Sequence, residues 1–384
     1  MRRVAILGST GSIGVKALEV IADFPARLRA TGLSTRSKVD LLAEQAARFQ
    51  PGIVNVTEAT EQIGALGRSF AGRITRGVEG LVELVRAVEA DLVLVATVGA
   101  VGIRPTLAAI DRGLDVALAN KEVLVSAGEI VMRRAKARGT RVLPIDSEHN
   151  AVAQCLAGAK PESAQRVILT ASGGPFRTRD PRQAAEATVE EALDHPTWAM
   201  GPKITVDSAT MMNKGFEVIE AMRLFDLPLE RIDVVIHPQS IVHSMVEFVD
   251  GSILAQLGVT DMYFPIQNIL LMPDRAPNKH APLDLTALGQ LTFEAVSFER
   301  FPCLRMAFEA ARAGGTAPAV LNAANEVAVS AFLERRMRFG GIARVIEETL
   351  RRHKPGPADT LEAVEAADAW ARQMAGQIVD GGGV

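Results

Sequence analysis

The first 146 residues alternate between short apolar runs and helical stretches, and this alternation constrains the fold more than any other feature. The run Val4–Leu7 ends at a glycine, and a helical pattern through Val15, Leu18 and Ile21 follows it. Apolar runs that alternate with helices form βαβ units and a parallel sheet, because the helices cover both faces of the strands. Further strands are predicted at residues 52–56, 92–97, 115–119 and 142–145, with helices at 78–88 and 122–138. We therefore predict an α/β fold whose residues 1–146 form a doubly wound nucleotide-binding domain.

The pattern changes at Ser147, and residues 147–272 are predicted to form an α+β domain. Strands are expected at residues 166–170, 231–236, 242–249 and 252–257, and a helix from about Ser208 to Phe225. The last two strands flank Asp250-Gly251, a strong hairpin signal. Residues 273–298 hold several prolines and little periodicity, which indicates a linker. Residues 299–384 are alanine-rich with helical periodicity at 319–332 and 360–374, which predicts a C-terminal helical bundle.

Composition excludes several classes of protein. Of the 384 residues, 48% are apolar and 23% are charged, as in ordinary globular proteins. The net charge of −3 gives no excess of positive charge for nucleic acid or an anionic membrane. Cys155 and Cys303 form no CxxC motif, which is typical of a reducing compartment and of buried small hydrophobes. The apolar stretch 92–103 is too short to cross a bilayer, and no cleavage site follows the basic start, so a cytoplasmic enzyme is expected.

A glycine-rich turn, GSTGSIG at residues 8–14, closes the first predicted strand and opens the first helix. Glycines permit a tight turn and close approach of a pyrophosphate to the free N–H groups of the helix N-terminus. The spacing is GxxGxxG, whereas GxGxxG is commoner, and many glycine turns serve only packing. Its place between strand and helix favours cofactor binding.

The end of the second strand distinguishes NAD from NADP, because a carboxylate there binds the ribose 2′-hydroxyl and a basic group accepts a 2′-phosphate. This chain carries Arg36, Ser37 and Lys38 and no acid, which favours NADP(H). A solvated basic turn explains these residues equally well when they are taken by themselves.

Two acids surround Ser147 at the end of the last parallel strand. In an extended chain Asp146 and Glu148 point the same way, and two converging carboxylates call for a cation. Oxygen ligands suit Mg²⁺ or Mn²⁺, and ligands bind at the carboxyl ends of parallel strands. The alternative is a helix N-cap at Asp146 or Ser147 with Glu148 in the first turn. Local sequence favours neither interpretation.

Polar residues also gather near the predicted helix 208–225. Asn213 and Glu217 are four residues apart and share a face, and Ser208, Asn213 and Lys214 are suited to a phosphate. An exposed polar face is the simpler interpretation of this segment alone. Before it, His195, Trp198 and Met200 lie in a loop that is predicted from about Arg182 to Pro202, is bounded by prolines and has no obvious core of its own. It is either a packed loop or a lid over a ligand.

These motifs together resemble one family, the 1-deoxy-D-xylulose 5-phosphate reductoisomerases of the non-mevalonate isoprenoid pathway. The resemblance covers nearly the whole chain. It rests on GSTGSIG (8–14), ALANKE (117–122), PIDSEHNA (144–151), TASGGPF (170–176), HPTWAMGPKITVDSATMMNKGFE (195–217) and HPQSIVHSMVEF (237–248).

The resemblance implies a homodimeric enzyme that rearranges 1-deoxy-D-xylulose 5-phosphate and reduces the product with NADPH to 2-C-methyl-D-erythritol 4-phosphate. It implies metal ligation by Asp146, Glu148 and Glu217, and catalysis by Lys121, Glu148, His195 and Glu217. The implied cofactor contacts are Gly8, Thr10, Gly11, Ser12, Ile13, Asn120, Glu122 and Gly201, with Arg36, Ser37 or Lys38 at the 2′-phosphate. The implied substrate contacts are Lys121, Ser147, Glu148, Ser172, His195, Trp198, Met200, Ser208, Asn213, Lys214 and Glu217.

The second-strand turn departs from the family, because Thr35-Arg36-Ser37-Lys38 stands where many members carry an Ala-Gly-(Lys/Arg)-Asn-like turn. Two other functions are compatible with parts of the pattern. One is a semialdehyde or homoserine-type dehydrogenase, and the semialdehyde type needs a cysteine nucleophile, for which Cys155 is the candidate. The other is a non-catalytic NADP(H)-sensing module, which does not require three carboxylates or a lysine–serine site for a substrate phosphate.

Overall fold

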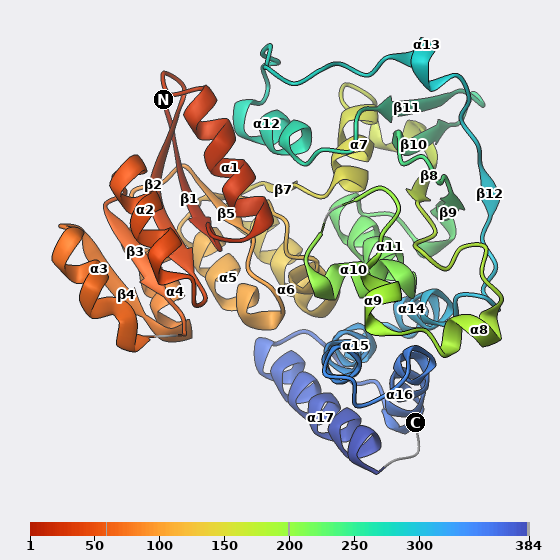
Figure 1. Cartoon of the computed structure of the whole chain (residues 1–384). Helices are drawn as coiled ribbons and strands as arrows, with labels where there is room; N and C mark the ends of the chain where they lie inside the picture. The colour runs from red at the N-terminus through yellow and green to blue at the C-terminus, as the bar shows by residue number, and fades with distance from the viewer. Residues whose placement is uncertain (59, 199, 382–384) are drawn as a thin grey trace. The chain divides into compact units, whose positions relative to one another are not determined.

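The computed structural model describes residues 1–58, 60–198 and 200–381, and the chain divides into two compact units (Figure 1). The first unit comprises Met1–Val123, Val131–Asn150 and Asp261–Ala281. The second comprises Leu124–Ile130, Ala151–Thr260 and the chain from Pro282 onward. The four-part division at residues 146, 272 and 298 stays a prediction.

A seven-stranded sheet, whose registered strand pairs are all parallel, forms the centre of the first unit. Its order is β4-β3-β2-β1-β5-β6-β7. Strands β2 to β4 lie on one side of β1 and strands β5 to β7 on the other, so the strand order reverses beside β1. Ligands bind beside such a reversal, at the carboxyl ends of the strands. The strands are β1 (Arg2–Leu7), β2 (Leu28–Thr35), β3 (Ile53–Val56), β4 (Arg73–Arg76), β5 (Leu92–Val95), β6 (Asp115–Leu118) and β7 (Val142–Pro144).

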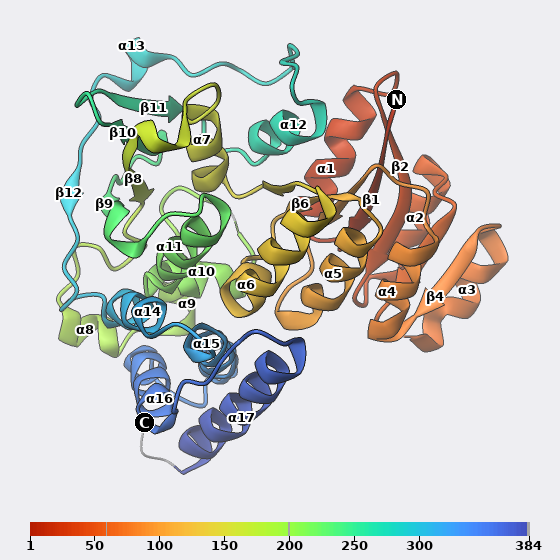
Figure 2. The same ribbon diagram turned by 180° about the vertical axis from the view of Figure 1, so that it is seen from behind.

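Helices cover both faces of this sheet: α1 lies on one face and α4 and α5 on the other (Figures 1 and 2). Central strands are therefore buried on both sides, and Val4–Leu7 is fully buried, which explains apolar runs without alternation. The helices are α1 (Ser12–Asp23), α2 (Val39–Phe49), α3 (Ile63–Ser69), α4 (Gly77–Ala87), α5 (Ile103–Asp111) and α12 (Tyr263–Leu271), while α6 (Lys121–Arg138) and α7 (Ser147–Cys155) belong partly to each unit.

Two parts of the first unit had no signal in the sequence. The strand β4 is an edge strand with only one buried residue, so it lacks an apolar run. The segment 261–281 returns to this unit through contacts distant in sequence. The hydroxyl of Tyr263 donates to Asp23 at 2.8 Å, and the Lys279 ammonium lies 3.3 Å from the same carboxylate.

A five-stranded mixed sheet of order β11-β10-β8-β9-β12 organises the second unit. Strands β8 and β9 are parallel, and the other neighbours are antiparallel. The hairpin at Asp250-Gly251 is confirmed, and Gly251 has φ +83°. The strands are β8 (Ala164–Ala171), β9 (Ile232–Ile236), β10 (Val242–Phe248), β11 (Ile253–Leu257) and β12 (Glu294–Ala295).

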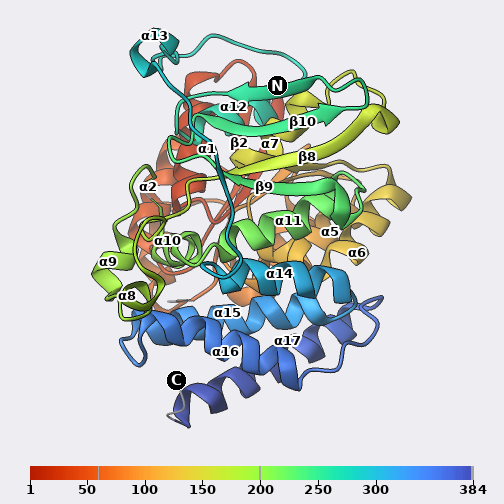
Figure 3. The ribbon, with the colours of Figure 1, turned by 90° about the vertical axis from the view of Figure 1, so that its right-hand side faces the viewer.

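Helices pack beneath this sheet in layers, with α11 next to the strands and the C-terminal helices below (Figure 3). The predicted C-terminal helices are confirmed. None of the helices in the described residues is long and apolar enough to cross a membrane. The helices are α8 (Pro181–Ala185), α9 (Val189–Leu193), α10 (Pro202–Ala209), α11 (Met212–Leu224), α13 (Leu285–Leu288), α14 (Pro302–Ala313), α15 (Ala317–Leu333), α16 (Phe339–Arg352) and α17 (Leu361–Asp380).

The predicted single helix from Ser208 to Phe225 is wrong, because two helices, α10 and α11, meet there. Met211 breaks the path with φ +60°, a left-handed conformation that is uncommon outside glycine. The Thr210 hydroxyl stabilises the break by donating to the Asp207 carbonyl and accepting from the N–H of Met212. Ser208 therefore lies at the end of α10 and not at the start of α11.

Candidate active site

The glycine turn between β1 and α1 has the geometry of an anion site. Gly8 has φ +91°, and a Cβ there would lie 2.5 Å from the carbonyl oxygen of Ala96, so only glycine fits. The helix α1 begins at Ser12, and its N-cap, Gly11, makes no side-chain cap bond. No acid lies in its first turn, so the N–H groups and the positive end of the helix dipole are available to a phosphate.

The end of β2 lies against this turn. The N–H of Gly8 donates to the Ser34 hydroxyl at 2.8 Å, and the hydroxyls of Thr10 and Thr35 are 2.7 Å apart. These bonds bring the residues that follow Thr35 next to the predicted pyrophosphate site.

Arg36, Ser37 and Lys38 are all exposed just beyond β2. The Arg36 guanidinium lies 2.8 Å from the carboxylate of Glu58, a residue that the sequence analysis did not single out. Two basic groups are therefore accessible where a 2′-phosphate is expected, and one already has an acidic neighbour.

Asn120 connects the start of α6 to a second turn, residues 97–102, which was not predicted as part of the site. Its side chain caps α6 by accepting from the N–H of Val123 at 3.0 Å. It also donates to the carbonyls of Thr97 and Gly99, at 2.8 and 2.9 Å. A usable signal existed, because residues 97–102 form a glycine-containing turn directly after the buried strand β5.

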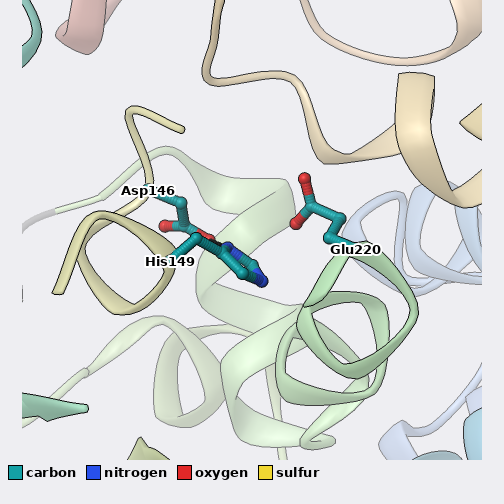
Figure 4. Close-up of side chains that lie close together, drawn as sticks. All are labelled: Asp146, His149 and Glu220. Atoms are coloured by element: carbon teal, nitrogen blue, oxygen red, sulfur yellow. Dashed lines mark ion pairs between the residues drawn. The ribbon is translucent and has the colours of Figure 1, made fainter. Parts of the chain in front are cut away.

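A buried charged cluster surrounds Asp146 at the end of β7. Its carboxylate forms an ion pair with the Lys121 ammonium. Nδ1 of His149 lies 3.5 Å from the same carboxylate, and Figure 4 shows these two side chains close together. Burial by itself would raise the pKa of Asp146, but Lys121 and His149 hold this pKa well below its ordinary value. The carboxylate is therefore ionised near neutral pH. No local pattern in the sequence indicates a role for His149 beside Asp146.

Glu148 lies near Asp146, but the backbone geometry that brings them together differs from the predicted one. The helix α7 begins at Ser147, so the extended-chain argument is wrong and Glu148 lies in a first helical turn. One carboxylate oxygen of Asp146 and one of Glu148 nevertheless lie within 4.8 Å. The Ser147 hydroxyl donates to Glu148 at 2.6 Å. The helix start and the carboxylate pair, which seemed to be alternatives, coexist.

The second unit holds a histidine between two serines. Nε2 of His195 lies 3.0 Å from the Ser172 hydroxyl and 3.1 Å from that of Ser208. Nδ1 accepts from the backbone N–H groups of Thr197 and Trp198, so in the neutral ring Nε2 carries the proton. Burial lowers the pKa of His195, which favours this neutral form.

Gly174 allows the end of β8 to approach α10 closely enough for this arrangement. Its φ is +65°, and a Cβ would lie 2.7 Å from the carbonyl oxygen of Ser208. Its N–H donates to the Ser172 hydroxyl at 3.2 Å. Gly174 of the TASGGPF motif therefore supports the two serines.

Lys214 and Glu217 form a buried ion pair on α11, and Asn213 donates to Glu217 at 2.6 Å. The prediction that Asn213 and Glu217 share a face is confirmed. The interpretation of this segment as an exposed polar face is wrong, because Lys214 is 3% exposed and Glu217 is 0% exposed. Even a paired charge carries a desolvation cost when it is buried, which makes this cluster a candidate site.

The predicted loop from Arg182 to Pro202 is partly helical, because α8 and α9 occupy its first half. Ala184 of α8, Ala192 of α9 and Ala187 between the two helices pack in the core of the second unit, so the prediction of a loop with no core of its own is wrong for this half. Outside these helices, Trp198 and Met200 are half-buried, and the Trp198 ring lies 6.3 Å from that of His243. Ala199 of this predicted loop lies outside the described residues.

The predicted site residues fall into two sets. The first unit holds Gly8, Thr10, Gly11, Ser12, Ile13, Arg36, Ser37, Lys38, Asn120, Lys121, Glu122, Asp146, Ser147 and Glu148. The second holds Ser172, His195, Trp198, Met200, Gly201, Ser208, Asn213, Lys214 and Glu217. Within each unit, residues distant in sequence come together, and the convergence of the two sets stays a prediction.

Cys155 does not have the surroundings of a thiol nucleophile. It is buried at the end of α7, and burial raises the pKa of its thiol, which disfavours the reactive thiolate. This environment argues against a semialdehyde-type dehydrogenase.

Comparison with known proteins gives one family along the chain. The family model of 1-deoxy-D-xylulose 5-phosphate reductoisomerase matches residues 4–128, and that of its C-terminal domain matches residues 142–225. The model of the DXP reductoisomerase C-terminal domain matches residues 257–374. The reductoisomerase of Symbiobacterium thermophilum is 53% identical over 378 residues, with 97% of each chain covered. That of Geobacter metallireducens is 50% identical over 381 residues, with 99% of each covered.

Solved structures agree with this result. The reductoisomerase of Zymomonas mobilis in complex with NADPH has a TM-score of 0.92 and 43% identity, and 99% of each chain is covered. A DOX-P reductoisomerase in complex with NADPH, fosmidomycin and magnesium has a TM-score of 0.92 and 40% identity, with 99% of this chain and 98% of that one covered. Similarity of this extent, at this identity, shows that the chain belongs to the 1-deoxy-D-xylulose 5-phosphate reductoisomerase family.

Proposed function

We propose that this chain carries out the reaction of its family with the residues described above. The enzyme converts 1-deoxy-D-xylulose 5-phosphate to 2-C-methyl-D-erythritol 4-phosphate with NADPH, in the non-mevalonate pathway to isopentenyl diphosphate. It is an NADP-dependent and metal-dependent oxidoreductase. The observation that best supports the residue assignment is the pair of carboxylates, Asp146 and Glu148, held beside Lys121 in the unit with the glycine turn.

The chain's own residues fit the cofactor. NADPH supplies the hydride that reduces the rearranged aldehyde. Gly8, Gly11 and the uncapped start of α1 receive its pyrophosphate, and Arg36 and Lys38 are accessible for the 2′-phosphate. Asn120 and Glu122, at the start of α6, and Gly201 complete the proposed contacts, together with Thr10, Ser12, Ile13 and Ser37.

Asp146 and Glu148 of the first unit and Glu217 of the second are the proposed metal ligands. Carboxylate oxygens suit Mg²⁺ or Mn²⁺, and the bound ion stabilises the negative charge that develops on substrate oxygens. Lys121 keeps Asp146 ionised and ready to ligate, and the Ser147 hydroxyl orients Glu148.

Ser172, Ser208, Asn213 and Lys214 are proposed to hold the substrate's phosphate. The two serine hydroxyls are held near each other by Nε2 of His195, and the Lys214 ammonium supplies the opposite charge. Trp198 and Met200 are proposed to cover the substrate and exclude water.

The homodimer and the cytoplasmic location also remain proposals. Strand β11 is an edge of the second sheet and carries exposed Ile253 and Leu254. An exposed apolar edge strand offers unpaired N–H and C=O groups with which another chain can pair, so we propose a second copy of the chain as its neighbour.

Turnover with the phosphosugar, NADPH and Mg²⁺ tests the function and separates it from NADP(H) sensing. We expect NADPH oxidation that stops with a chelator and returns with Mg²⁺ or Mn²⁺. Glu148→Gln should abolish turnover while leaving the NADPH Kd unchanged. Glu89→Gln, which changes an exposed acid of the same unit, is the matched control and should leave both unchanged. NADPH binding without any turnover would instead indicate the sensing module.

A further inference from the structure

A buried carboxylate that has no place in the proposed site lies directly before Ser208. Asp207, on α10, is 1% exposed and accepts a hydrogen bond at 2.8 Å from the side-chain amide of Asn325, which lies on α15. Nζ of Lys203, one turn earlier on α10, lies 2.9 Å from the other carboxylate oxygen. The Asp207–Asn325 pair therefore joins the helix that carries Ser208 to a C-terminal helix 118 residues away in sequence.

Stability does not explain this pair well. Buried charges and amides carry a large desolvation cost, and apolar residues of similar volume often replace them without loss of stability. Asn325 is fully buried, and among the described residues its Oδ1 has no hydrogen-bond partner. A buried hydrogen bond with one unsatisfied atom, in a helix that is otherwise rich in alanine, indicates that the Asp207–Asn325 pair fixes an orientation and does not serve packing alone.

The location of Asp207 shows which side chain the Asp207–Asn325 hydrogen bond can orient. Ser208 follows it directly, and the Ser208 hydroxyl is 3.1 Å from Nε2 of His195. Rotation of α10 about its axis would carry Ser208 away from His195. The apolar contacts of this 8-residue helix, through Val206 and Ala209, are less directional than the hydrogen bond between Asp207 and Asn325.

We propose that Asp207 and Asn325 are positioning residues, which hold α10 so that the Ser208 hydroxyl meets the substrate's phosphate. This inference rests on the proposed phosphate role of Ser208 and Lys214. It gives the C-terminal helix α15 a part in substrate recognition, through one hydrogen bond.

Asn325→Ala tests the proposal against a matched control, Asn322→Ala. Asn322 lies in the same helix and is equally buried, but it donates within α15, to Glu326 at 3.0 Å. We expect Asn325→Ala to raise the KM for the phosphosugar about tenfold and to leave the NADPH Kd unchanged. Asn322→Ala should leave the KM unchanged, even if both variants lower Tm. Equal KM values in the two folded variants would overturn the proposal.

An exchange of the two side chains provides a rescue. Asn325→Asp alone places two carboxylates face to face, so the KM for the phosphosugar should rise further. The double variant Asp207→Asn with Asn325→Asp restores an amide–carboxylate bond in the opposite sense, and the KM should return towards that of the parent enzyme. A double variant no better than Asn325→Asp, with Tm restored, would show that the pair is merely structural.

Lys214→Ala separates this proposal from the proposed function. If Lys214→Ala lowers discrimination between the phosphosugar and its dephospho analogue while Asn325→Ala does not, the positioning role is wrong and the phosphate site stands. If Lys214→Ala leaves discrimination unchanged, the phosphate assignment itself is wrong, and with it the proposed role of α10.

Discussion

The ring of His195 shows how single atoms set the properties of this site. Both nitrogens are engaged, Nδ1 as an acceptor from two backbone N–H groups and Nε2 between two serine hydroxyls. A protonated ring has no acceptor, so protonation must break the bonds that shape the turn at Thr197 and Trp198.

Acid should therefore weaken substrate binding through His195. Its pKa in the folded chain is lowered from 6.5 by burial, so the unfolded chain binds the proton more readily. The stability of this turn is complete above pH 6.5 and is lost as the pH falls through the lowered pKa. We expect the KM for the phosphosugar to rise over that interval. His195→Gln keeps a donor near the Nε2 position and does not titrate, so its KM should be higher but should not rise further as the pH falls. If the KM of this variant rises at low pH as it does in the parent enzyme, the assignment is contradicted.

The charge of Lys214 should account for much of the phosphate recognition. A charge-assisted hydrogen bond contributes roughly 1.5–3 kcal/mol, so Lys214→Ala should lower kcat/KM by about one to two powers of ten. The loss should be much smaller with the dephospho analogue. Lys160→Ala removes an exposed lysine of the same unit and should have no effect.

Cofactor choice should depend on the residues that follow β2. Replacing Arg36 and Lys38 by Ala should raise the KM for NADPH far more than that for NADH, because only NADPH carries the 2′-phosphate. Arg29→Ala, an exposed arginine on the same strand, is the control. Glu58→Gln should lower the KM for NADPH modestly, since an exposed ion pair of this kind is worth about 0.2–1 kcal/mol. Equal changes for both cofactors would place the 2′-phosphate elsewhere.

At the scale of the element, the segment between α9 and α10 is the part of the second unit best suited to respond to a ligand. Its preceding helices are packed by alanines, while Trp198 and Met200 are only half-buried. The first half of the predicted loop therefore serves as an anchor, and closure is expected only from about Asp194 to Gly201.

Trp198 gives a direct measurement of that closure. The chain has two tryptophans, so Trp370→Phe leaves Trp198 as the single reporter. Its fluorescence should change when a phosphonate mimic of the substrate is added with NADPH and Mg²⁺, because the half-buried ring exchanges water for a ligand surface. Trp198→Ala should lower kcat/KM. A rigid packed loop would give unchanged fluorescence and a variant that loses Tm but not kcat/KM.

At the scale of the whole molecule, the proposed homodimer should depend on the edge strand β11. Ile253 and Leu254 are each 51% exposed, and a charge on this edge should prevent pairing of two copies. Leu254→Lys should shift the mass measured by light scattering towards the monomer. Val78→Lys introduces the same charge at an exposed apolar site of the first unit and should not shift it. A parent chain that is already monomeric would rule the dimer out.

Local sequence determined the elements whose signals lie within a few residues. The strand β1 with its glycine turn, the hairpin at Asp250-Gly251 and the C-terminal helices were all predicted, because burial on two faces, turn chemistry and helical period leave periodic patterns. The identity of the family followed from ordered strings of residues such as those at 195–217, which no single motif could have supplied.

The tertiary structure alone decided which side chains meet across long separations. The edge strand β4, the return of residues 261–281 and the Asp207–Asn325 bond have no local signal, because each depends on chain segments that are distant in sequence. The same holds for the burial of Lys214 and Glu217, which a local pattern presents as an exposed polar face. A helical period records which residues share a face, but what covers that face is a property of the folded chain.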